Sequence, residues 1–103
     1  MYKRQTNGTG DAYATVSGGR FNTAGGGTST ISGGLSNTAS GQESNVGGGD
    51  GNTASGTEST VGGGNSNTAS GSRSIVGGGQ NNDAIAQLSF IGCLLYTSPS
   101  PRD

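Results

Sequence analysis

Apolar and polar residues alternate along this chain, and the alternation returns at a fixed interval. In the segment 59–63, Ser, Val and Gly alternate with Thr and Gly, and a similar order begins again 15 residues later. Residues two apart lie on the same face of a β-strand, because successive side chains point to opposite faces. The pattern therefore predicts short strands, each with one inward and one outward face.

These strands belong to a tandem repeat of 15 residues. Each copy opens with asparagine, at Asn7, Asn22, Asn37, Asn52, Asn67 and Asn82. The order that follows is Asn-Thr-Ala-Ser-Gly-x-x-Ser-x-Val-Gly-Gly-Gly-x-x, and we number these places 1 to 15. A fixed short period indicates one structural unit that packs against its neighbours. The density of glycine opposes a helical repeat.

The repeat predicts two strands per copy, at about places 1–5 and 8–12, with turns at places 6–7 and 13–15. Gly, Asn, Asp and Ser gather at these turns, whose geometry favours them. Copies stacked about 4.8 Å apart would align equivalent residues in ladders. The predicted fold class is an all-β, glycine-rich parallel β-solenoid, or β-roll, of 15-residue coils. Glycines at places 12 and 13 are expected to have positive φ or to approach the next coil closely.

The interior of this solenoid is predicted from places 10 and 3, which hold Val or Ile and Ala. The expected core residues are Val16, Ile31, Val46, Val61, Val76 and Ile91, facing Ala24, Ala39, Ala54, Ala69 and Ala84. Because each coil has so few apolar groups, the free energy gained by burying them is small compared with the entropic cost of ordering the backbone. We therefore expect several identical chains to associate as a parallel homotrimer, with place 10 nearest the common axis.

Composition excludes several classes of function. The chain has 26% hydrophobic and 11% charged residues and a net charge of −1. A nucleic-acid partner is not expected without a basic patch. Membrane contact by this segment is not expected either, because an apolar run of about 18 residues is missing. Abundant Gly, Ser and Thr would suit a flexible linker, but a linker has no such register.

The sequence offers little catalytic chemistry, and we expect no enzyme and no cofactor. Histidine is absent, and Cys93 is the single cysteine. Glu43, Glu58 and Arg73 share place 7 and are expected to stack as a solvated ladder rather than to face each other across a cleft. Asp50 lies in a Gly-rich turn but is not repeated in the other coils, so a calcium or other metal site is not expected.

One outward row carries an alternative hypothesis. Thr stands at place 2 in four consecutive copies, as Thr23, Thr38, Thr53 and Thr68, and Ser40, Ser55 and Ser70 stand two residues later in three of them. These side chains are expected to form a regular outward hydroxyl array, of a kind that suits binding to ice or another crystal lattice. Thr is also favoured at exposed strand positions, and the simpler interpretation of the array is a purely structural role.

The segment 59–71, Ser-Thr-Val-Gly-Gly-Gly-Asn-Ser-Asn-Thr-Ala-Ser-Gly, resembles the head repeats of trimeric autotransporter adhesins, the YadA-like head family. The resemblance extends from Asn7 to about Gly92. It implies a left-handed roll of three chains, an extracellular location on a bacterial surface, and a host or extracellular-matrix surface molecule as partner. The implied function is a rigid, repetitive spacer and adhesive surface. Bacteriophage tail fibres contain similar repeats, and a tail-fibre segment is a further alternative.

The repeat divides the chain into three parts. Residues 7–92 form the array of about six coils, whereas residues 1–6 and 93–103 lack the repeat. The last part contains both prolines and the cysteine, and no glycine. Both tails are expected to be non-native extensions of a fragment from a longer protein, and to pack poorly because they lack inward places.

Overall fold

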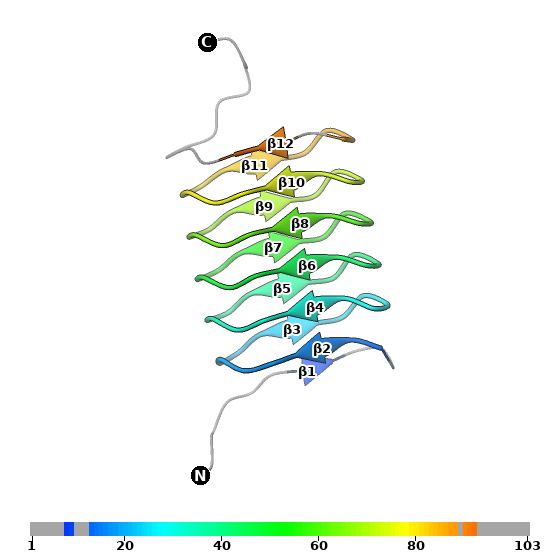
Figure 1. Ribbon diagram of the computed structural model, residues 1–103, viewed down its shortest axis with the longest axis vertical. Helices are drawn as coiled ribbons and strands as arrows, with labels where there is room; N and C mark the ends of the chain where they lie inside the picture. Colours follow the sequence, from blue (N-terminus) through cyan, green and yellow to red (C-terminus); the bar gives the residue numbers. More distant parts are fainter. Residues whose placement is uncertain (1–7, 10–12, 89, 93–103) are drawn as a thin grey trace.

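The computed structural model describes residues 8–9, 13–88 and 90–92, which form a β-solenoid of stacked coils (Figure 1). Two parallel sheets of two-residue strands run along the stack. The first sheet contains β1 (Gly8–Thr9), β3 (Thr23–Ala24), β5 (Thr38–Ala39), β7 (Thr53–Ala54), β9 (Thr68–Ala69) and β11 (Asp83–Ala84). The second contains β2 (Thr15–Val16), β4 (Thr30–Ile31), β6 (Asn45–Val46), β8 (Thr60–Val61), β10 (Ile75–Val76) and β12 (Phe90–Ile91). No described residue is helical.

Each strand pairs with the strand one coil away, in register. Thr53 pairs with Thr68 in the first sheet, and Val46 pairs with Val61 in the second, so partners are 15 residues apart. This confirms the predicted fold class, an all-β parallel solenoid with two strands in each 15-residue coil. The strands were predicted too long: they occupy places 2–3 and 9–10 only, because the backbone turns sharply soon after each.

The sharp turns come from residues in the left-handed region, and these residues are mostly not glycine. Glu58 at place 7 has φ 60°, and Ser66 at place 15 has φ 59°. At each corner the backbone N–H donates to the preceding coil: Glu58 N to Gln42 O at 2.8 Å and Ser66 N to Asp50 O at 2.9 Å. These bonds between coils hold a conformation that L-residues rarely adopt. The repeat gave no indication of them, because places 7 and 15 vary in residue type.

A third ladder, also unpredicted, runs along the turn at place 14. Single bridges connect residues Arg20, Leu35, Asp50, Asn65 and Gln80 in coil order. Adjacent coils are therefore hydrogen-bonded along this turn as well as along both sheets. The coil is thus tied to its neighbours at several points around its perimeter.

The interior is formed by the rows at places 3 and 10. Among the described residues, Ala24, Ile31, Ala39, Val46, Ala54, Val61, Ala69, Val76 and Ala84 form one buried hydrophobic cluster. Val16 is half-buried against it, and the side chain of Ile91 lies outside the described residues. Val46 and Val61 are each 0% exposed within a single chain. The Val row is thus covered by the chain's own Ala row, and no partner chain is needed to bury it.

The interior also contains a row of asparagine side chains, which link neighbouring coils. The Asn side chain at place 1 is buried: Asn52 Nδ2 donates to Gly48 O at 2.8 Å and to Gly64 O at 3.0 Å. Asn52 Oδ1 accepts from the N–H of Asn67, one coil further on, at 2.9 Å. A buried polar group is tolerated when it is hydrogen-bonded. The asparagine that marks each repeat is therefore a structural link between coils.

The glycine prediction is confirmed at place 13, whereas Gly63 at place 12 does not fulfil it. Gly64 has φ +95°, and a Cβ there would collide with the backbone of Gly79 and with the side chain of Asn67. At Gly63 a Cβ would meet nothing within 4 Å, and φ is not in the positive range that excludes side chains. A close approach that was not predicted occurs at place 5, where a Cβ on Gly56 would overlap the backbone of Gly71.

Candidate functional site

The most regular outward surface lies on the first sheet. We call it the threonine face: Thr23, Thr38, Thr53 and Thr68, with Ser40, Ser55 and Ser70 two residues further along the chain. The four threonines are in register across β3, β5, β7 and β9. They point outward because the Ala that follows each one points into the core. The structure thus brings the predicted hydroxyl array together on one sheet.

Solvent reaches this face, and its threonine hydroxyls are not used by the fold. Thr23 is exposed, Thr38, Thr53 and Thr68 are half-buried between neighbouring coils, and Ser55 is exposed. Within the described part of the chain, these threonine hydroxyls form no hydrogen bond to the protein. Thr28, in a turn, differs because its Oγ1 lies 2.6 Å from Gly27 O. The hydroxyls of the threonine face are therefore available to water or a ligand.

The outward face of the second sheet is a different surface, and the sequence did not single it out. Its residues occupy place 9 and are Thr15, Thr30, Asn45, Thr60, Ile75 and Phe90. The row is polar in the first coils and apolar in the last two: Ile75 is 40% and Phe90 68% exposed, and the two are paired in register. The change from polar to apolar residues at place 9 is the sequence feature that could have revealed this surface.

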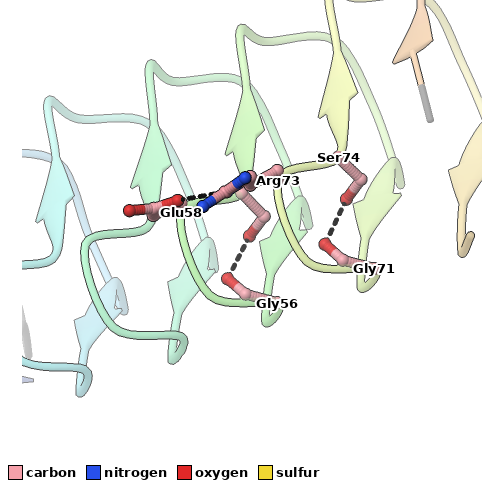
Figure 2. A network of polar contacts seen from close by, with 6 residues as sticks. Gly56, Glu58, Gly71, Arg73 and Ser74 are labelled. Carbon is pink, nitrogen blue, oxygen red and sulfur yellow. Dashed lines mark hydrogen bonds and ion pairs between the residues drawn. The ribbon is translucent and has the colours of Figure 1, made fainter. Parts of the chain in front are cut away.

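The charged residues at place 7 lie at the corner between the two sheets. Arg73 Nε donates to Glu58 Oε1 at 2.8 Å, across one coil (Figure 2). This hydrogen bond from Arg73 lowers the pKa of Glu58, and the positive charge of Arg73 lowers it further. Both side chains are exposed to solvent, so the pair contributes little to stability. Figure 2 also shows Ser74, whose Oγ donates to Gly71 O at 2.7 Å inside the coil.

The described residues contain no cluster of three or more His, Cys, Asp or Glu suited to a metal ion. Within the same residues there is no apolar helix of membrane-spanning length. Cys93, Asn7 and both predicted tails lie outside the described residues.

No family model, curated protein or solved structure matches the chain.

Proposed function

We propose that this chain is a segment of an extracellular surface adhesin head or fibre, where it acts as a rigid, repetitive spacer and adhesive surface. The observation that supports this most is the continuity of hydrogen bonding between coils. Thr53 N donates to Asn67 O at 2.8 Å in one sheet, and Thr60 N to Ser74 O at 3.0 Å in the other. Equivalent bonds recur from coil to coil, so each added coil extends the same rod.

The surface of the rod suits repeated weak contacts. Outward places align in ladders, so a side chain that contacts a ligand is presented again in each coil that retains it. Such repetition raises avidity without any single strong site. Adhesion to a host or matrix surface molecule and location on a bacterial surface remain part of the proposal, as the resemblance to YadA-like heads implies. A phage tail fibre would use the same rod.

We also propose that the chain forms a homotrimer, but that the contacts between chains do not involve the Val and Ile residues of place 10. Because Val46, Val61 and Val76 are covered within one chain, contacts between chains would involve outward residues instead. The apolar end of the second sheet, at Ile75 and Phe90, is an exposed apolar surface suited to such contacts. Sedimentation equilibrium of the full chain distinguishes a trimer from a folded monomer.

Insertion of one coil tests the spacer role. A second copy of residues 37–51 placed after residue 51 should fold, keep the melting temperature or raise it, and lengthen the rod by about 4.8 Å in small-angle X-ray scattering. The control duplicates only residues 37–40. It shifts the Ala and Val rows from inward places 3 and 10 to exposed places 7 and 14 and should lower the melting temperature. Equal behaviour of both insertions would contradict the proposed rod.

Adhesion is tested separately, with beads that carry the full chain or the variant lengthened by one coil. Retention on matrix-coated surfaces should exceed that of bare beads and should increase with the added coil. Retention no greater than for bare beads would remove the adhesive role and leave the spacer role.

A further inference from the structure

Within this chain, the repeats provide an internal comparison of outward places. Places 6, 7 and 14 change residue type in almost every coil; place 14, for example, reads Arg20, Leu35, Asp50, Asn65 and Gln80. Divergence at these places shows that recent duplication has not kept the copies identical. Place 2 nevertheless holds Thr in four consecutive coils. A constraint on that outward place is therefore required.

Strand structure alone does not provide the constraint. Place 9 is the equivalent outward place of the second sheet, and there Thr30, Asn45, Thr60 and Ile75 occupy successive strands with the same parallel pairing. The strand thus accepts Asn and Ile as well as Thr. Thr53 also makes no side-chain hydrogen bond within the described residues. The remaining difference is that the threonine face presents a regular row of hydroxyl and methyl groups to solvent.

The chemistry of the threonine face narrows the class of ligand. Between Thr23 and Ser70 its outward residues are Thr, Ser and one Gly, with no charge and no aromatic ring. A mineral or a polyanion would be bound by charged side chains, and a flat sugar chain by stacked aromatic rings. Uncharged hydroxyl and methyl groups in a regular row match a lattice of water molecules.

The spacing of the rows agrees with that lattice along the rod. Water oxygens hydrogen-bonded at about 2.8 Å with tetrahedral angles place second neighbours about 4.5 Å apart. Coils repeat at about 4.8 Å, so a row of four threonines accumulates a mismatch of only about 0.9 Å. In the chain direction the face has only one interval, of about 6.6 Å, between the Thr and the Ser of each coil. No mismatch accumulates in that direction.

We propose that the threonine face binds ice, with the hydroxyls of Thr23, Thr38, Thr53 and Thr68 occupying positions of the water lattice. This activity goes beyond the spacer role and does not depend on it. A rod that carries the face would attach its bearer to ice or limit the growth of crystals. The face lies on one sheet only, so the second sheet supplies a matched control surface on the same molecule.

The experiment compares Thr53→Lys in β7 with Thr60→Lys in β8, both at half-buried outward positions. The full chain is frozen slowly in dilute solution, and its concentration in the ice fraction is compared with that in the remaining liquid. The native chain should be enriched in the ice. Thr53→Lys should reduce the enrichment about tenfold, as loss of a central contact does, and Thr60→Lys should leave it unchanged. Thermal hysteresis should follow the same order.

Melting curves by circular dichroism establish that each variant is folded. If Thr53→Lys does not fold, Thr38→Lys and Thr30→Lys form an equivalent pair in β5 and β4. Exclusion of the native chain from ice would overturn the proposal, as would equal loss in the two members of a pair. Binding to crystalline cellulose or chitin that requires Thr53, without enrichment in ice, would overturn it in favour of a polysaccharide ligand. None of these outcomes affects the coil-insertion test of the spacer.

Discussion

Two adjacent glycines offer a sharp test of how the coils pack. Gly64 and Gly63 have no side chain and lie in the same turn, yet the structure gives them opposite roles. In Gly64→Ala the new Cβ would lie 2.6 Å from Asn67 Nδ2 and 2.9 Å from Gly79 N, and closer still to Gly79 O. In Gly63→Ala the Cβ would have nothing within 4 Å.

The cost of Gly64→Ala has two parts. An L-residue with φ near +95° is disfavoured by about 1–2 kcal/mol. The collision also displaces the hydrogen bond from Asn67 Nδ2 to Gly79 O, which is 2.9 Å long; leaving such buried groups unpaired costs about 1–3 kcal/mol. The total of about 2–5 kcal/mol is a large part of the stability of a small domain. Gly63→Ala should stay neutral or gain about 0.4–1 kcal/mol, because Ala has less freedom in the unfolded chain.

Thermal unfolding of the full chain, followed by circular dichroism, measures the difference. For a domain of this size each kcal/mol moves the midpoint by about 4–8 °C. Gly64→Ala should therefore melt about 8–40 °C below the native chain, whereas Gly63→Ala should melt within a few degrees of it or above. Equal midpoints for the two variants would refute the assignment of close packing to place 13.

Three further predictions concern other contacts. Asn52→Ala should lower the free energy of unfolding by about 2–4 kcal/mol in urea titration, because the buried N–H of Asn67 then has no acceptor. Thr28→Asn should raise it by about 1 kcal/mol, because Asn tolerates φ 53° better than a β-branched residue does. Arg73→Gln should raise the pKa of Glu58, measured by NMR titration of its carboxyl group, because the hydrogen bond and the charge that lower it are lost. The native pair stabilises the fold above the usual pKa of Glu, and this contribution is lost as pH falls through the lowered pKa.

Each of these predictions has a control. Asn65→Ala removes an exposed asparagine at place 14 and should change stability by less than about 0.5 kcal/mol; a loss equal to that of Asn52→Ala would contradict the buried ladder. Thr30→Asn lies in β4, where φ is not positive, and should not stabilise the chain. A Glu58 pKa that does not change in Arg73→Gln would show that the ion pair is absent in solution.

The sequence by itself determined the period, the fold class and the direction of the side chains. Alternation around Val61 and Ala69 requires one inward and one outward set, and a period of 15 requires equivalent residues to align. These features depend only on local backbone geometry and on repetition. For the same reason the threonine face was predictable: Thr53 adjoins an inward Ala, and its copies follow at a fixed interval.

Only the tertiary structure shows how neighbouring coils pack and hydrogen-bond to one another. Asn52 shares the face of Ala54 by alternation, but the partners of its buried amide are carbonyl oxygens 4 residues before it and 12 residues after it, which the sequence does not reveal. Whether Gly63 or Gly64 meets the next coil depends on the path of the turn, which the run of three glycines does not reveal. The coverage of Val61 also depends on the partner row. Each coil places Ala opposite Val, and that pairing seals a single chain because both side chains are small enough for the two sheets to pack closely.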